Sequence, residues 1–345
     1  MSDNPASSAP NSLPRLGWSD FFHNQLGMDE ASLLPMRLAA IHRARLTAIS
    51  ETGPAEVLLP VGSNTGQFAV GDWVLVDGET RTLRRRLDRR TLLERRAEHS
   101  KTAQLGAANV DTLFIVTSCN SEFNVARLER YLALANEGGT DPVILLTKAG
   151  TAPAADEYRE QAAALQRGLA VITLDPRSES ASTALAPWCG FGRTIALVGS
   201  SGVGKSSLVN SLTSFGEGVQ ETGAVRVHDA KGRHTTTARS FHAMAGGGWV
   251  IDTPGMRSLQ VTEALHGLEV LFAEITELAP LCRFRDCTHA HEPGCAVQVA
   301  VLHGAIDPER LARWHKLSNE NASGSTSATG PRGNKIPAPG WTSRR

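Results

Sequence analysis

The glycine-rich segment at residues 199–206 is the strongest chemical signal in the sequence. It reads GSSGVGKS and matches the pattern G-x-x-x-x-G-K-[ST] at every defined position. Its glycines let the backbone wrap around phosphate groups so that successive N–H groups point inward. Lys205 then reaches the β- and γ-phosphates, and Ser206 ligates Mg²⁺. The residues expected to bind a nucleotide here are Gly199, Ser200, Ser201, Gly202, Val203, Gly204, Lys205, Ser206 and Ser207.

The flanks of this segment are those that a phosphate loop requires. Residues 194–198 form an apolar run that is typical of a buried strand, and residues 207–210 can open a helix. A glycine/serine turn that fits the pattern by chance needs neither flank. The flanks therefore favour a nucleoside triphosphate site.

A second motif, DTPG at residues 252–255, follows the apolar residues 249–251. In P-loop enzymes the aspartate of this motif holds the Mg²⁺ shell, and its glycine N–H senses the γ-phosphate. Asp252 is therefore the expected metal-side residue, and Gly255 is expected to contact the nucleotide.

The threonine-rich stretch GRHTTT at residues 232–237 lies between these motifs. A threonine hydroxyl in such a loop can complete Mg²⁺ coordination when the γ-phosphate is present, and this orders the loop. We assign that role to Thr236, with Thr237 as one alternative and an ordinary polar surface loop as the other. The expected catalytic residues are thus Lys205, Ser206, Asp252 and Thr236, with Ser206 and Asp252 on the magnesium.

A candidate for base recognition lies before the phosphate loop rather than after it. The apolar run at residues 143–146 ends in Thr147, Lys148, Ala149 and Gly150, at the place of an N/T-K-x-D motif that binds guanine. The order of motifs is therefore base, phosphate loop, DTPG. A circularly permuted chain can build the usual sheet in this order, since the strands need only meet in space.

Three cysteines and a histidine lie close together near the C-terminus, at Cys282, Cys287, His289 and Cys295. Three thiolates and one imidazole suit a closed, tetrahedral and therefore structural zinc site. His291 is a competing ligand. The other two of the five cysteines, at positions 119 and 189, are isolated and we expect them to be structural.

An arginine-rich stretch at residues 81–96 holds eight arginines against one aspartate and one glutamate, a net charge of +6. Such a segment suits contacts with a nucleic-acid backbone, although a solvated charged face is the plain alternative. The arginines expected to bind RNA are Arg84, Arg85, Arg86, Arg89 and Arg90.

The elements that must position these residues fall into three parts. Residues 36–97 show short β-rich runs with glycine turns, which predict an OB-like β-barrel. Residues 98–261 alternate apolar strands with helices, which predicts a parallel α/β sheet. Residues 262–317 predict a mainly helical zinc-binding domain that ends with a helix through Lys316.

The expected strands of the central part are 112–117, 142–146, 170–174, 194–198 and 249–251, and its expected helices are 125–136 and 154–167. Residues 1–35 are interpreted as a tail and lead-in, and residues 318–345 as a disordered tail.

The bulk composition is that of an ordinary globular protein. The chain has 345 residues, 41% of them hydrophobic, and a formal net charge of zero, so total charge indicates no partner. No run approaches the roughly 18 apolar residues that span a bilayer, and the N-terminus lacks the apolar core of a secretory signal. We therefore expect a cytoplasmic, monomeric protein without a membrane partner.

These motifs in this order resemble the circularly permuted GTPases of small ribosomal subunit assembly, the RsgA or YjeQ family. The resemblance covers residues 36–317 and also rests on Gly71-Asp72 and on the ANVD sequence at residues 108–111. It implies hydrolysis of GTP to GDP and phosphate with Mg²⁺, stimulated by the small subunit. It further implies contact with ribosomal RNA late in assembly and one zinc ion held with His289.

Two residues depart from what guanine binding and hydrolysis usually use. Gly150 stands where the family has an aspartate, whose loss costs on the order of a few kcal/mol of base discrimination. Met256 stands where Ras-like enzymes have a glutamine that orients the attacking water, so we expect slow hydrolysis by the free protein. The group that orients the water is then expected to be His234 or to come from the bound partner. Two other functions stay open: a P-loop NTPase with relaxed base specificity, and an RNA-binding scaffold with a regulatory nucleotide site.

Overall fold

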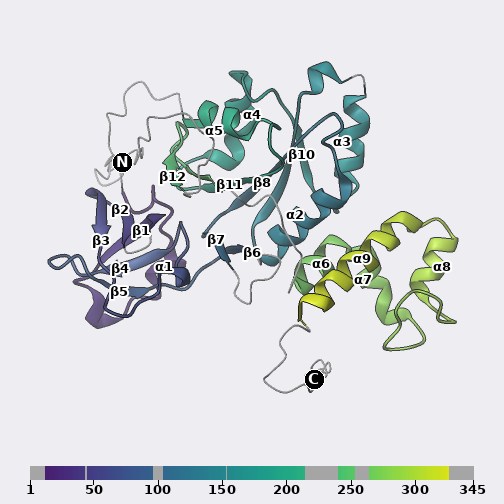
Figure 1. The fold of residues 1–345 in the computed structure, drawn as a ribbon, viewed down its shortest axis with the longest axis horizontal. Coiled ribbons are helices and arrows are strands. Elements are labelled where there is room, and N and C mark those ends of the chain that lie inside the picture. The colour runs from purple at the N-terminus through teal and green to yellow at the C-terminus, as the bar shows by residue number, and fades with distance from the viewer. Residues whose placement is uncertain are drawn as a thin grey trace, which may run out of the picture.

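The structure, a computed structural model, describes residues 12–42, 45–95, 104–152, 154–213, 240–252 and 264–325. Three units lie side by side along the molecule: a β-barrel, a sheet covered by helices, and a group of helices (Figure 1). The expected positions of Thr236, Gly255, Met256 and His234 lie outside the described residues.

A lead-in segment precedes the barrel and packs against it. It contains the short helix α1 (Asp20–His23) and the 3-10 turn η2 (Met28–Glu30). Leu16 and Phe22 are buried, and the ring of Trp18 meets that of Trp73 edge-on, with centroids 4.8 Å apart. The lead-in therefore adds apolar cover to the barrel.

The barrel is a five-stranded antiparallel sheet whose two edges meet. Its strands follow the order β3-β2-β1-β4-β5, and the backbone N–H of Leu83 in β5 donates to the carbonyl oxygen of Leu58, just after β3 (2.9 Å). The ring of strands is a small barrel of the OB type, as the sequence predicts. The strands are Leu34–Ile41 (β1), Leu46–Ser50 (β2), Gly53–Val57 (β3), Trp73–Val76 (β4) and Leu83–Arg86 (β5), with the turn η3 at Thr65–Gln67.

The last barrel strand ends well before residue 97, the expected boundary. Strand β6 (Leu92–Arg95) instead pairs with β7 (Gln104–Ala108) in a separate two-stranded sheet. Leu93 is fully buried in the main core of the protein, and the N–H of Leu92 donates to the carbonyl of Gly138 (3.0 Å). The buried side chain of Leu93 therefore attaches strand β6 to the central unit.

The central unit is a six-stranded sheet with the order β10-β9-β8-β11-β13-β12, in which only β12 is antiparallel to its neighbour. All five strands predicted here are confirmed to within one or two residues. The strands are Thr112–Ser118 (β8), Asp141–Thr147 (β9), Ala170–Thr173 (β10), Thr194–Val198 (β11), Ser240–Ala243 (β12) and Trp249–Asp252 (β13).

The helices of this unit differ more from the expectation. The predicted helix at 154–167 is shorter, and the helix Ser180–Cys189 is not predicted, because serines and Pro187 disfavour a helix. The helices are Val125–Glu137 (α2), Ala155–Ala163 (α3), Ser180–Cys189 (α4) and Lys205–Thr213 (α5), with the turn η4 at Ala149–Thr151.

The C-terminal unit is helical, as predicted, but its last helix is longer. Helix α9 continues to Ser325 rather than ending at Lys316. Asn321 is buried and its side-chain oxygen accepts from the N–H of Ala264 (2.9 Å), so this extension packs on the rest of the unit. Its elements are Leu265–Leu271 (α6), Ala273–Leu278 (α7), Ala279–Leu281 (η5), Ala296–Leu302 (α8) and Pro308–Ser325 (α9).

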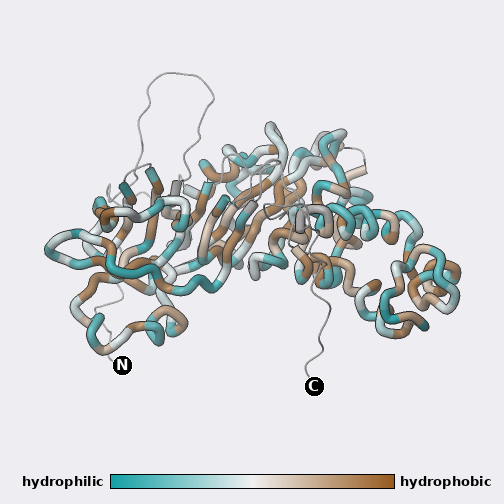
Figure 2. The backbone as a smooth tube through the Cα atoms, turned by 60° about the horizontal axis from the view of Figure 1, so that its bottom comes forward, coloured by the Kyte–Doolittle hydropathy of each residue, from teal (hydrophilic) through white to brown (hydrophobic). Residues whose placement is uncertain are grey.

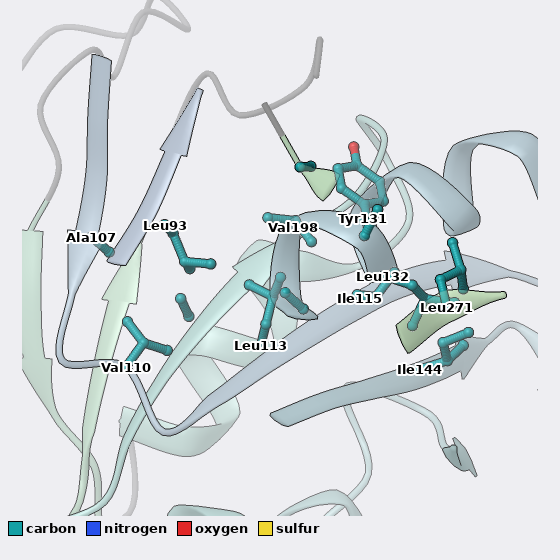
Figure 3. Close-up of a cluster of buried hydrophobic side chains, with 14 of the residues drawn as sticks. Leu93, Ala107, Val110, Leu113, Ile115, Tyr131, Leu132, Ile144, Val198 and Leu271 are labelled. Atoms are coloured by element: carbon teal, nitrogen blue, oxygen red, sulfur yellow. The ribbon is translucent and has the colours of Figure 1, made fainter. Parts of the chain in front are cut away.

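One apolar core joins the central sheet to both of its neighbours. Leu93 at the barrel side, Leu113 in the sheet and Leu271 in α6 belong to the same cluster of buried side chains (Figure 3). The central strands β8, β9 and β11 are mostly hydrophobic and buried (Figure 2), as expected for a parallel sheet that is covered on both faces. Within the described residues, no helix is long and apolar enough to cross a membrane.

Candidate nucleotide and zinc sites

The phosphate loop connects the end of β11 to the start of α5, which confirms the predicted strand, glycine loop and helix. Gly199 has a φ of 141° and Gly204 a φ of 106°. A Cβ at Gly199 would lie 2.1 Å from the carbonyl oxygen of Val116. Only glycine fits there, since the loop presses directly on β8.

Lys205 folds back over the loop that precedes it. Its Nζ donates to the carbonyl oxygen of Gly199 (2.8 Å) and to that of Ser200. Val203 is buried and anchors the loop, whereas Ser206 is exposed on the first turn of α5. Lys205 and Ser206 are consecutive residues at the start of α5, where a site for a phosphate group and its metal requires them.

Thr147 connects the base loop to the phosphate loop. It is the last residue of β9 and is buried, and its Oγ1 donates to the carbonyl oxygens of Val203 (2.8 Å) and Thr117 (3.1 Å). The sequence predicts Thr147 as a nucleotide contact. In the structure its hydroxyl also links the base loop to the phosphate loop, through the backbone oxygen of Val203, and the nucleotide contact stays a prediction.

Lys148 and Gly150 lie on the exposed side of the base loop. Lys148 has a left-handed backbone, with a φ of 59°. A Cβ added at Gly150 would meet no atom within 4 Å. The position of the missing carboxylate is therefore open space rather than a site filled by another side chain.

A third loop completes this junction, and the motifs did not reveal it. Pro176, just beyond β10, would lie 3.0 Å from a Cβ at Gly204, and its carbonyl accepts from the hydroxyl of Ser211 in α5 (2.6 Å). The available signal was topological, because the segment after a parallel strand beside β9 must emerge at the same edge of the sheet.

Asp252 ends β13 at the same edge as the phosphate loop. Strand β13 pairs in parallel with β11, with Ile251 opposite Ala196, so the two strands finish close together. Asp252 is half-buried, which leaves its carboxylate available to a metal shell. Its two expected partners, Thr236 and Gly255, lie beyond the described residues, so their roles remain predictions.

Cys282, Cys287, His289 and Cys295 converge in the C-terminal unit, with their ligand atoms all within 4.8 Å of one another. The Sγ–Sγ distance between Cys282 and Cys295 is 3.8 Å, and Nδ1 of His289 lies 3.5 Å from each of these two sulfurs. Ligands at tetrahedral zinc are roughly 3.8 Å (sulfur–sulfur) and 3.5 Å (sulfur–nitrogen) apart, given the usual bond lengths. The four side chains therefore fit a zinc ion.

The geometry selects His289 over His291 as the fourth ligand. His289 is buried, with a left-handed φ of 58°, and its carbonyl accepts from the side chain of Gln298 (2.5 Å). His291 is exposed and is not part of the group. Helix α8 begins directly after Cys295, whose sulfur accepts from the N–H of Gln298 (3.4 Å), so metal binding and this helix start are linked.

Arg84 and Arg85 of β5 are paired with carboxylates of the barrel and lead-in. Arg85 makes two bonds to Glu30, at 2.7 and 2.6 Å, and the guanidinium lowers the pKa of Glu30 to about 2. Arg84 pairs with Asp77 (2.8 Å). Part of the charge predicted for RNA therefore stabilises the local fold.

The arginines after β5 connect the barrel to the central unit. Arg89 makes two bonds to the fully buried Asp72, at 2.6 and 2.8 Å. Arg90 pairs with Asp111, just before β8, and the other oxygen of Asp111 accepts from the N–H of Thr194 (2.8 Å). Both arginines thus have a structural role, which charge counting alone did not reveal.

Known proteins match this arrangement along most of the chain. The model of the RsgA GTPase family matches residues 86–262. A Mesorhizobium japonicum protein named small ribosomal subunit biogenesis GTPase RsgA is 64% identical over 328 residues, or 95% of each chain. A Vibrio vulnificus protein named small ribosomal subunit biogenesis GTPase RsgA 2 is 47% identical over 321 residues, which cover 92% of this chain and 90% of that protein.

Solved structures share the fold. The crystal structure of YjeQ from Thermotoga maritima matches 84% of this chain and 98% of its own, with a TM-score of 0.59 and 23% identity. A second structure, YloQ, described as a circularly permuted GTPase, gives the same TM-score of 0.59 and covers 86% of this chain. From the family model and the relatives that span nearly the whole chain, this protein belongs to the RsgA family of GTPases.

Proposed function

We propose that this protein hydrolyses GTP to GDP and phosphate while bound to the small ribosomal subunit, and that it acts in the late assembly of that subunit. One observation carries the proposal: the hydroxyl of Thr147 joins a base loop to a P-loop in permuted order. Relatives from Mesorhizobium and Vibrio with matching chains are named for this function.

The residue roles follow the chemistry of phosphoryl transfer. Lys205 and the N–H groups of its loop hold the β- and γ-phosphates, while Ser206 and Asp252 hold Mg²⁺, which neutralises charge on the transferred group. Thr236 and Gly255 sense the γ-phosphate. With Met256 in place of glutamine, the attacking water is oriented by another group, which the bound subunit supplies or places.

The attached units supply the contacts with RNA. We assign the barrel to strands β1 to β5, the GTPase domain to the central unit from β6 to β13, and the zinc domain to the helical unit from α6 to α9, whose four ligands hold one structural zinc ion. On the barrel, Arg84 is a better candidate for contact with ribosomal RNA than Arg89, since its side chain is 53% exposed whereas that of Arg89 is only 13% exposed. The protein acts as a monomer in the cytoplasm, where subunits are assembled.

A sedimentation experiment with purified small subunits tests this function. The protein should pellet with subunits in a non-hydrolysable GTP analogue and remain in the supernatant in GDP. The Lys205→Ala variant, which loses its phosphate contact, should show no difference between the two nucleotides. Equal pelleting of the unmodified protein in both nucleotides would contradict a cycle in which hydrolysis releases it.

A second candidate, an NTPase with relaxed base specificity, is favoured by one feature. The position of the family's guanine-binding carboxylate is Gly150, and the space beside it is open. ATP that competes equally with GTP for the site would support this alternative.

A further inference from the structure

A single buried cation joins the barrel to the catalytic sheet. Arg37 of β1 is 1% exposed, and its guanidinium donates to carbonyl oxygens from three separate segments. Nε binds Gly71 in the barrel (3.3 Å), Nη2 binds Asn109 before β8 (2.8 Å), and Nη1 binds Leu16 in the lead-in. A planar guanidinium with fixed donor directions holds these three segments in one arrangement.

The same guanidinium lies over an aromatic ring of the catalytic sheet. Its Cζ is 4.8 Å from the centroid of Phe241 in β12. The Phe241 ring stacks on Trp249 of β13, with centroids 4.5 Å apart and planes within 1°. Trp249 in turn donates from Nε1 to the carbonyl of Arg15 in the lead-in (2.7 Å). Lead-in, barrel and strand pair are therefore connected through one set of contacts.

These contacts reach the end of β13 that carries the acid of the DTPG motif. In the antiparallel ladder Phe241 pairs with Ile251 and Ser240 pairs with Asp252. A Cβ at Gly71 would lie 3.2 Å from Cδ1 of Ile251, so the barrel backbone touches the residue immediately before Asp252.

The barrel covers this face of β12 and β13 where a helix would otherwise pack. The opposite face is covered by α5, since Val250 clusters with Leu208 and Leu212. Phe241 and Ile251 belong instead to the core cluster that includes barrel side chains. The position of β13 is therefore set between a helix and the barrel.

Burying the charged side chain of Arg37 between the barrel and the central sheet costs free energy. Desolvation lowers the pKa of Arg37 to about 9, which shows what burial costs its charged form. An apolar side chain of similar volume is commonly as stable as a buried charge or more so. An apolar side chain could not replace Arg37 here, because only the guanidinium holds three backbone carbonyl oxygens and the Phe241 ring in one arrangement.

We propose that Arg37 is a positioning residue of the magnesium site, which sets the place of β13, and so of the Asp252 carboxylate, through Phe241 and Trp249. The inference rests on the proposed role of Asp252 in holding Mg²⁺. The barrel then forms part of the catalytic geometry, and force applied to it by RNA acts on the metal side of the nucleotide rather than on the base side.

The test compares magnesium dependence with nucleotide affinity. Arg37→Lys keeps the positive charge but loses the planar guanidinium that makes the three hydrogen bonds. Phe241→Leu removes the aromatic ring under the guanidinium. Both should raise the Mg²⁺ concentration for half-maximal GTP hydrolysis by about tenfold, which corresponds to about 1.4 kcal/mol of Mg²⁺ binding free energy, because β13 is then less firmly placed. Affinity for GDP without Mg²⁺ should change by less than about twofold, because the phosphate and base loops do not contact Arg37.

Two further variants make the outcome decisive. Arg45→Met removes an exposed barrel arginine that pairs with Glu56, and it should leave magnesium dependence unchanged. Asp252→Asn should shift it at least as much as Arg37→Lys. A lower melting temperature with unaltered magnesium dependence in both Arg37→Lys and Phe241→Leu would make the contact merely structural and overturn the inference. An Asp252→Asn variant with normal magnesium dependence would instead show that the proposed role of Asp252 is wrong, and the inference would fall with it.

Discussion

Gly150 is the residue at which the nucleotide site of this chain departs from the guanine-binding pattern of its family. Its neighbours keep their places, since Lys148 is exposed beside it and Thr147 is fixed against the phosphate loop. A carboxylate at this position would accept from the N1–H and the 2-amino group of guanine. With glycine there, this residue offers no side chain to read the 2-amino group.

We therefore predict that the protein hydrolyses GTP and ITP with kcat/KM values within about twofold, because ITP lacks only the 2-amino group. Gly150→Asp should raise the preference for GTP over ITP and ATP by about tenfold or more, and the open space at this position accommodates the side chain. Gly150→Asn, of the same size but with an amide, is the control and should not show this gain. A strong preference for GTP over ITP in the unmodified protein would refute the prediction.

Substitution of the two histidines of the zinc loop, His289 and His291, should affect zinc binding differently. His289→Ala should lose zinc and part of the helical circular dichroism signal, because the ion links the loop to the start of α8. His291→Ala should keep about one zinc ion per chain, since that side chain is exposed outside the ligand group. Metal content and circular dichroism measure both. Equal zinc content in the two variants would contradict the assignment.

Sequence patterns predicted the residues that act as contiguous motifs, and missed those that act through space. The phosphate loop could be recognised from the sequence because its glycines, lysine and serine lie within eight positions. Arg37 carries no local signal, since its acceptors lie far away along the chain at Leu16, Gly71 and Asn109. The bond from the hydroxyl of Thr147 to the backbone of Val203 was likewise not predicted, because no local pattern joins two residues that lie so far apart along the chain.

At the scale of elements, the junction between α9 and α2 is held by a buried charge cluster. Arg310 of α9 binds the fully buried Glu129 of α2 (2.9 Å) and donates to the carbonyls of Leu165 (2.8 Å) and Leu271 (2.7 Å). Arg313 also binds Glu129 (2.9 Å). A buried carboxylate that loses one partner is poorly compensated, because its charge remains out of water.

Arg310→Met should lower the free energy of unfolding by about 3 kcal/mol, as measured by urea denaturation. The matched control is Arg167→Met, whose ion pair with Glu277 is 72% and 58% exposed, and its effect should be no more than about 1 kcal/mol. Similar losses in the two variants would show that the cluster does not hold the helices together.

The pair between η2 and β5 predicts a pH dependence. Arg85 holds the pKa of Glu30 at about 2, below its ordinary value of 4.5. A lowered pKa means that the unfolded chain binds the proton more readily, so the pair stabilises the fold above about pH 4.5 and this contribution disappears as the pH falls toward 2. Glu30→Gln should therefore be less stable than the unmodified protein at pH 7, and the difference should vanish at low pH.

Thermal denaturation at several pH values measures this difference. A constant difference between Glu30→Gln and the unmodified protein from pH 7 to pH 3 would argue against the pair.

The sequence predicted strands well where both faces are buried. It predicted less well which unit a strand joins and where a helix ends, since these depend on tertiary packing. The five parallel strands of the central sheet are mostly apolar runs, so the sequence predicted their positions, whereas β12, with the sequence SFHA, was not predicted. Strand β6 was assigned to the barrel because it follows it in sequence, yet Leu93 is buried in the central core. The end of α9 depends on the contact between Asn321 and Ala264, which no local propensity encodes.

At the scale of the whole molecule, the two attached units hold opposite ends of the catalytic sheet. The barrel packs on β12 and β13, the strand that ends in Asp252. Helices α6 and α9 pack on α2, where a Cβ at Gly267 would lie 2.1 Å from the carbonyl of Ala133, and α2 connects β8 to the strand that ends in the base loop. Figure 1 shows the sheet between these units, so a subunit that contacts both can act on the nucleotide site from two sides.

The most direct test of the central claim is GTP hydrolysis by the purified protein with and without small ribosomal subunits, with ATP in parallel. We predict slow turnover by the free protein and a stimulation by subunits on the order of 100-fold, the effect of one well-placed transition-state donor, for GTP and not for ATP. Turnover of GTP that small subunits leave unchanged would contradict the proposed function.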